Sequence, residues 1–304
     1  MMHPAIRAAI ELGLHSERVP VPGGRLHLVR AGEGPPLLLL HGWPEFWLAW
    51  RPLIERLADR FALLAPDLRG FGASGKWEPE PSASIGPEVH ARHLLDLLDL
   101  LGVAKVGLVG HDVGAYVMQA MARLAPERLV GLFFFDCPTP LVGSRWAAPR
   151  QLAEIWYQTF NQLPIAPLLV GASDAACRAY LGHFLRHWAH RKDAFDDELD
   201  RWVAVYRMEH NLEGGFDWYR SVAAARLAVI EGRAPAPEPV RLPTRVLWGR
   251  HDPVLRADWA DRLPELFPDL ELGFAEASGH FPFREEPELA ASAVAAFFAR
   301  IGWA

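Results

Sequence analysis

The stretch VGHDVG, residues 109–114, decides the fold of this chain. An apolar run suited to a strand, Lys105 to Val109, leads into it, and Ala115 to Leu124 follows with the pattern of a helix. Two glycines flank Asp112, and each is separated from it by one residue. This spacing is typical of a nucleophile elbow, a sharp strand-to-helix turn that holds one side chain above the edge of a sheet. The sequence therefore predicts that Asp112 stands at such an edge and acts as a nucleophile.

Short apolar runs alternate with helical patterns on both sides of this turn. Such alternation predicts an α/β fold, in which helices cover both faces of a mostly parallel central sheet. The expected strands are 26–29, 37–40, 61–65, 105–109, 129–135, 244–248 and 270–274. The expected helices are 45–58, a segment around 94–101, 115–124, 257–266 and 288–301.

The alternation stops between residues 138 and 240. This stretch has no strand pattern, is rich in aromatic residues, and closes with APAPEP at 234–239, which cannot continue a helix. We therefore expect residues 1–137 and 241–304 to form one core domain, into which residues 138–240 insert a helical cap.

Composition excludes several classes of protein. The 304 residues are 51% hydrophobic and carry a formal net charge of −6, which gives no reason to expect nucleic acid or an anionic membrane as a partner. No apolar run is long enough to span a membrane, and the first 18 residues do not have the pattern of a signal peptide. Two cysteines, Cys137 and Cys177, predict a reducing compartment without a disulfide framework. We expect a cytoplasmic protein.

Three further segments support a catalytic interpretation of Asp112. HGWPE, residues 41–45, directly follows an expected strand, so the backbone N–H groups of Trp43 and Val113 are the predicted donors of an oxyanion hole. WGRHDPV places Asp252 just after one late strand, and SGHFPF places His280 after the next. The chain order of nucleophile, acid and histidine is the one that accompanies such an elbow.

An aspartate nucleophile selects a different chemistry from a serine. Attack on an acyl carbon would produce an anhydride, whereas attack on an sp³ carbon displaces a leaving group and produces an alkyl ester. Water activated by His280 then hydrolyses that ester, while Asp252 orients the histidine. Asp136, in FFFDCP, is an alternative acid because it also follows a strand. The expected substrates are alkylating electrophiles, either epoxides or alkyl halides.

Together with APDLRGFGASG, these segments resemble the epoxide hydrolases of the α/β-hydrolase fold. Haloalkane and haloacetate dehalogenases share most of the same features. The resemblance favours Asp252 over Asp136 as the acid, because HDPV is the more usual form in epoxide hydrolases. It also implies two cap tyrosines that activate the epoxide oxygen: Tyr157, in WYQTF, and Tyr219, in FDWYRS.

The resemblance implies hydrolysis of a small apolar epoxide to a vicinal diol without any cofactor. A dehalogenase with the same triad is the alternative, but Val113 stands where many of these enzymes have a tryptophan halide donor. Val113 and Tyr116 also replace the arginines by which haloacetate enzymes hold the substrate carboxylate. A non-catalytic small-molecule-binding protein of the same fold is the alternative of another class.

Two other patterns do not predict a cofactor. GFGASG, residues 70–75, matches a dinucleotide fingerprint, but it neither follows a strand directly nor opens a helix, so a glycine-rich turn is expected. His183, His187 and His190 share one helical face, but no further ligand completes a zinc-binding pattern. No metal is therefore expected.

Overall fold

The computed structural model describes residues 2–74 and 85–304. Its centre is an eight-stranded sheet with the strand order β1-β2-β4-β3-β5-β6-β7-β8, in which β2 is antiparallel to both neighbours and the remaining pairs are parallel. The strands are β1 (His15–Val21), β2 (Gly24–Ala31), β3 (Pro36–Leu40), β4 (Ala62–Pro66), β5 (Val106–His111), β6 (Leu129–Phe135), β7 (Thr244–Gly249) and β8 (Leu270–Ala275). The predicted α/β architecture is confirmed.

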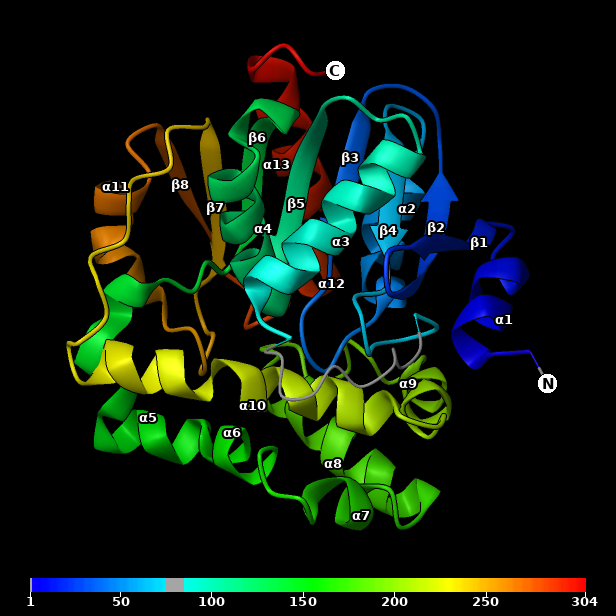
Figure 1. Ribbon diagram of the computed structural model, residues 1–304, viewed down its shortest axis with the longest axis vertical. Helices are drawn as coiled ribbons and strands as arrows, with labels where there is room; N and C mark the ends of the chain where they lie inside the picture. Colours follow the sequence, from blue (N-terminus) through cyan, green and yellow to red (C-terminus); the bar gives the residue numbers. More distant parts are fainter. Residues whose placement is uncertain (1, 75–84) are drawn as a thin grey trace.

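Helices cover both faces of this sheet (Figure 1). The helices α3 (Pro87–Leu100) and α4 (Val113–Leu124) lie on one face, and α2 (Arg51–Leu57) and α13 (Pro287–Arg300) lie on the other. Because both faces are covered, every residue of β5 is buried, which agrees with the apolar run VGLVG that precedes His111 in this strand. Shorter helical segments complete the core: α1 (Pro4–Glu11), η1 (Trp47–Trp50), η2 (Pro126–Arg128), η4 (Ala257–Arg262), α11 (Leu263–Leu266) and α12 (Pro282–Glu285).

Between β6 and β7 the described chain is helical, as the sequence predicts. The elements are η3 (Pro140–Ala147), α5 (Pro149–Glu154), α6 (Trp156–Phe160), α7 (Ala166–Val170), α8 (Asp174–His187), α9 (Leu199–Tyr206) and α10 (Asn211–Ile230). They form a layer at one end of the sheet, with α10 next to the core (Figure 1). We keep the division into a core of 1–137 and 241–304 and a cap of 138–240 as a proposal.

The structure corrects several predicted element boundaries. The helix expected at 45–58 begins only with η1 at Trp47, because the Asp67 carboxylate accepts a hydrogen bond from the Trp47 N–H and Phe46 is extended. The sequence analysis also missed β1, an edge strand whose sequence HSERVPV contains no continuous apolar run. The segment 70–74 forms turns as expected, while Gly75 lies outside the described residues.

Two further observations bear on what the composition predicted about membrane spans and disulfides. No helix in the described part of the chain is both long and apolar enough to cross a membrane. Cys137 and Cys177 are buried free thiols.

Candidate active site

The nucleophile elbow lies at the junction of β5 and α4. Asp112 stands between these elements with φ 48° and ψ −111°, a backbone conformation that L-residues rarely adopt. Gly114 makes the junction possible, because a Cβ at that position would lie only 2.0 Å from the carbonyl oxygen of Leu40 on β3. The sequence places a strained, close-packed turn here, and the turn directs the Asp112 carboxylate away from the sheet edge.

Two backbone donors hold one oxygen of this carboxylate. Asp112 Oδ1 accepts a hydrogen bond from the Val113 N–H at 2.6 Å and from the Trp43 N–H at 3.3 Å. Burial disfavours ionisation of Asp112, but His280, His111 and the Trp43 N–H together lower its pKa. The side chain is 16% exposed. Asp112 is therefore an ionised carboxylate that can meet a ligand.

The loop that carries Trp43 is fixed by a buried acid that the sequence analysis did not single out. Glu45 Oε2 accepts a hydrogen bond from the Gly42 N–H at 2.5 Å and lies 3.1 Å from His111 Nδ1. A Cβ on Gly42 would lie 2.5 Å from the Cβ of Asp112, so only glycine lets the loop approach this closely. The motif HGWPE contains both residues, but only the fold shows that Glu45 reaches back to the loop and across to β5.

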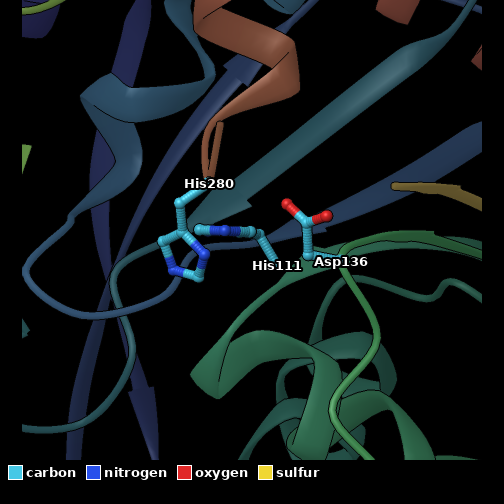
Figure 2. A group of neighbouring side chains, drawn as sticks. All are labelled: His111, Asp136 and His280. Atoms are coloured by element: carbon cyan, nitrogen blue, oxygen red, sulfur yellow. The ribbon is translucent and has the colours of Figure 1, made fainter. Parts of the chain in front are cut away.

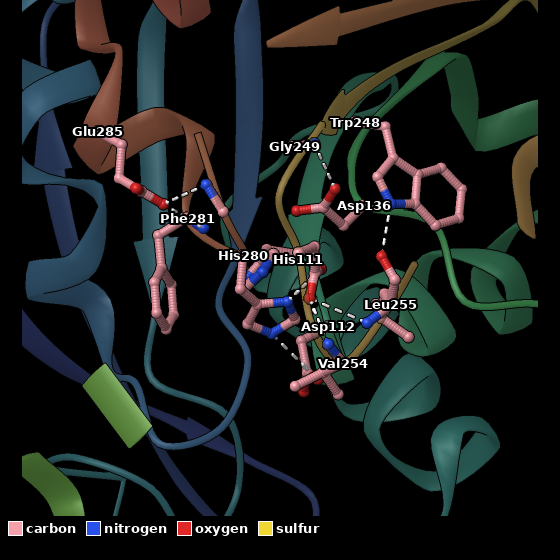
Figure 3. A network of polar contacts seen from close by, with 12 residues as sticks. His111, Asp112, Asp136, Trp248, Gly249, Val254, Leu255, His280, Phe281 and Glu285 are labelled. Atoms are coloured by element: carbon pink, nitrogen blue, oxygen red, sulfur yellow. Dashed lines mark hydrogen bonds and ion pairs between the residues drawn. The ribbon is translucent and has the colours of Figure 1, made fainter. Parts of the chain in front are cut away.

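His280 lies between Asp112 and Asp252. Figure 3 shows His280 beside Asp112 and near His111. Its Nδ1 is 2.6 Å from Asp252 Oδ2, and its Nε2 is 3.8 Å from Asp112 Oδ2, which is longer than a hydrogen bond. The other oxygen of Asp252 accepts hydrogen bonds from the N–H groups of Val254 and Leu255. Burial alone would lower the pKa of His280, but the charges of Asp252 and Asp112 outweigh it and raise this pKa well above its ordinary value. The arrangement suits a base oriented by an acid.

The alternative acid, Asp136, has a different environment. One of its oxygens accepts a hydrogen bond from the Gly249 N–H at 2.7 Å, and the other is buried without a hydrogen-bond partner in the described part of the chain. Burial and the neighbouring charge of Asp252 raise the pKa of Asp136 well above its ordinary value. Asp136 therefore ionises less readily than an exposed aspartate. The structure brings Asp252, not Asp136, into hydrogen bonding with His280.

His111, Asp136 and His280 gather in one buried cluster (Figure 2). Each offers a possible metal-ligand atom, and these atoms lie within 4.8 Å of one another. The rings of His111 and His280 are packed with their centroids 4.4 Å apart. A metal ion held there would engage the imidazole that a hydrolytic reaction needs as its base. The histidines at 183 and 187 stack on each other, whereas His190 stacks on His251, so the three cap histidines do not converge.

A cavity of about 260 Å³ lies between the core and the cap. Asp112 lines it from the core, and Tyr157 and Tyr219 line it from α6 and α10. The two tyrosine rings are perpendicular, with centroids 5.5 Å apart, and both pack against the indole of Trp43. Burial raises the pKa of both phenols, so each keeps its proton. Of the predicted site residues, Asp112, Tyr157 and Tyr219 line this cavity. Trp43 and Val113 donate to Asp112 through their backbone N–H groups, and His280, which is hydrogen-bonded to Asp252, lies behind Asp112. Asp136 lies beside His280 but forms no hydrogen bond with it among the described residues.

Comparisons with known proteins identify the family of the fold. The family model described as alpha/beta hydrolase fold matches residues 35–287. The chain belongs to this family.

Several relatives of this chain are named epoxide hydrolases. The chain is 29% identical over 282 residues to the soluble epoxide hydrolase of Corynebacterium sp. (strain C12), covering 92% of this chain and 95% of that protein. It is 30% identical over 266 residues to epoxide hydrolase 4 of Mus musculus, covering 85% and 72% of the two chains. The solved structure of the epoxide hydrolase CorEH without ligand is 28% identical, with a TM-score of 0.82 and coverage of 95% and 99%. This alpha/beta hydrolase is therefore similar to epoxide hydrolases over nearly its whole length.

Proposed function

We propose that this alpha/beta hydrolase converts an epoxide to a vicinal diol through an alkyl ester of Asp112. The observation that carries the proposal is the arrangement at that residue. One carboxylate oxygen lies between two backbone donors, the other faces His280, and two phenols line the same cavity. Asp252 is the proposed acid of the triad.

In the first step, Asp112 Oδ2 attacks a carbon of the epoxide ring. A carbon–oxygen bond to Asp112 forms as the ring bond breaks, and the electron pair of that bond passes to the ring oxygen. Tyr157 or Tyr219 donates its proton to this oxygen and regains one from the solvent. The ring oxygen stays in the product as a hydroxyl group and therefore needs a proton donor. A departing halide needs none.

In the second step, water gives a proton to His280, and its oxygen attacks Cγ of Asp112. The negative charge of the tetrahedral intermediate develops on Oδ1, where the N–H groups of Trp43 and Val113 already donate. Collapse of the intermediate expels the diol oxygen, which takes the proton from His280, and Asp112 returns one proton to the solvent as it ionises. The negative charge of Asp112 contributes to the raised pKa of His280. Alkylation of Asp112 removes this charge and lowers the pKa of His280, so the neutral histidine can accept the proton from water.

The test is to isolate the ester. In His280→Gln the ester should form and persist, so intact-protein mass spectrometry should show a gain equal to the whole epoxide, mapped to Asp112 by peptide analysis. The double variant Asp112→Ala/His280→Gln is the matched control and should gain no mass.

Each other result contradicts the proposal in a specific way. A gain only from a 1-haloalkane, with loss of the halide, would assign the dehalogenase alternative. No adduct from either compound, in a variant with the circular dichroism of the parent protein, would leave only the non-catalytic binding alternative.

A further inference from the structure

The cavity contains a cation that the proposed reaction does not use. Arg226 lies on α10 seven residues after Tyr219, and Val222 and Val229 line the cavity from the same helix. Residues spaced three, four and seven positions apart share one face of a helix. One side of α10 therefore presents a phenol, then apolar surface, then a guanidinium to the same space.

The Arg226 guanidinium has no hydrogen-bonding partner among the described residues. Its carbon Cζ lies 4.0 Å from the centroid of the Trp146 ring, and its Nη2 is buried without any hydrogen bond. Stacking on an indole uses only the face of the guanidinium, and its N–H donors point outward in the plane. An unpaired buried donor of this kind is costly unless a ligand completes it.

Neighbouring arginines show that this situation is particular to Arg226. Arg123, which also lines the cavity, lies 3.5 Å from Glu88. Arg220, on the same helix, forms an ion pair with Asp217. Arg123 and Arg220 therefore each pair with a carboxylate. None of the described carboxylates forms an ion pair with Arg226.

The position of Arg226 restricts the length of the ligand. Seven residues correspond to about 10 Å along a helix axis, and helical side chains lean toward the N-terminus, which here means toward Tyr219. A ligand that contacts both residues must therefore carry its anionic group several carbon atoms from the group held by the phenol. A two-carbon haloacid is too short to do so. The negative charge of Asp112 also disfavours a second anion close to the reacting carbon.

We propose that the substrate is an epoxide whose carbon chain bears a carboxylate, and that Arg226 binds this carboxylate through its free in-plane donors. The inference rests on the proposed epoxide hydrolysis and names its substrate class. An arginine fork matches the two oxygens of a carboxylate, and the apolar surface of Val222 and Val229 accommodates the chain between the two groups.

Paired substrates test this preference. We would measure kcat/KM for a medium-chain ω-epoxy acid and for its primary amide, which has nearly the same shape without the charge. The wild-type protein should prefer the acid, and Arg226→Gln should lower the acid-to-amide ratio by about tenfold to a hundredfold. Arg226→Lys, which keeps the charge but not the fork, should give an intermediate ratio.

A charge-matched control is Arg233→Gln. Arg233 is exposed just beyond the end of α10 and pairs with Glu231, so its loss removes the same charge without changing the ratio. Equal kcat/KM for acid and amide in the wild-type protein would overturn the inference while leaving epoxide hydrolysis intact. A ratio unchanged in both Arg226 variants would do the same.

Ligand binding separates this inference from the proposed reaction. Calorimetry should show that hexanoate binds the wild-type protein more tightly than hexanamide, and that Arg226→Gln abolishes the difference. This result would support the carboxylate site even if no epoxide were hydrolysed. Tighter binding of hexyl phosphate than of hexanoate, lost in the same variant, would overturn the assignment to a carboxylate.

Discussion

The two walls of the cavity are built in different ways. On the core side, Asp112 lines the cavity, and behind it His280 and Asp252 are fully buried, with hydrogen bonds 2.6 to 2.9 Å long that fix each oxygen of Asp252. On the cap side, Tyr157 and Tyr219 are held mainly by aromatic packing against Trp43 and each other. Directed hydrogen bonds set the geometry of a reaction, whereas ring packing sets the shape of the space. In the proposed reaction, the core wall therefore supplies the chemistry, and the cap wall selects the leaving group and the substrate.

Changing the core wall should have the largest effect. Asp252→Asn should lower kcat for an epoxide by about 10²- to 10⁴-fold, because the His280 imidazolium loses its main stabilising charge. The same loss lowers the pKa of His280, so the acidic limb of the hydrolysis rate should move to lower pH. Single-turnover rates of ester hydrolysis measured across pH would check both. An acidic limb that stays in place would show that another group sets the pKa of His280.

Changing the cap wall should affect formation of the ester rather than its hydrolysis. Tyr219→Phe should slow alkylation by an epoxide by about tenfold to a hundredfold, since Tyr157 remains as a second proton donor. The Tyr157→Phe/Tyr219→Phe double variant should lose far more than either single one. Rapid-quench measurement of the ester separates the two steps. A double variant that alkylates as fast as the parent protein would remove the phenols from the mechanism.

Asp136→Asn should have the smallest effect, with less than about a tenfold change in kcat. Burial and Asp252 already disfavour the charged form of Asp136. An amide has a shape similar to that of a carboxyl group, and its oxygen also accepts the hydrogen bond from the Gly249 N–H. Steady-state kinetics beside Asp252→Asn would compare the two carboxyl groups directly. A larger loss from Asp136→Asn than from Asp252→Asn would reverse their assignment and make Asp136 the acid.

Motif-based predictions were most useful where the chain is strained or closely packed. The elbow around Asp112 and the loop at Gly42 tolerate few residue types, so both leave a clear sequence pattern. Element boundaries were less predictable. The late start of the helix at Trp47 depends on Asp67, which is distant in the sequence, and β1 is half polar because it is an edge strand.

Other features left no pattern at all. Glu45 holds the loop of Trp43 through a contact with Gly42 that only the folded turn creates. Arg226 is one of several cap arginines, and nothing in its neighbours along the chain marks it as an arginine that lines the cavity and forms no ion pair with the described carboxylates.

The sequence by itself determined the α/β class, the helical insertion and the order of the residues proposed to act, because strand periodicity and turn sterics are local properties. Only the tertiary structure decided that Asp252 rather than Asp136 forms a hydrogen bond with His280. Both acids follow neighbouring strands, but the Asp252 carboxylate is directed toward His280 and the Asp136 carboxylate toward the Gly249 N–H. The tertiary structure also decided that burial and the charge of Asp252 raise the pKa of Asp136, and that Arg226 Nη2 has no hydrogen-bond partner among the described residues. Burial and charge pairing depend on residues brought together from distant parts of the chain.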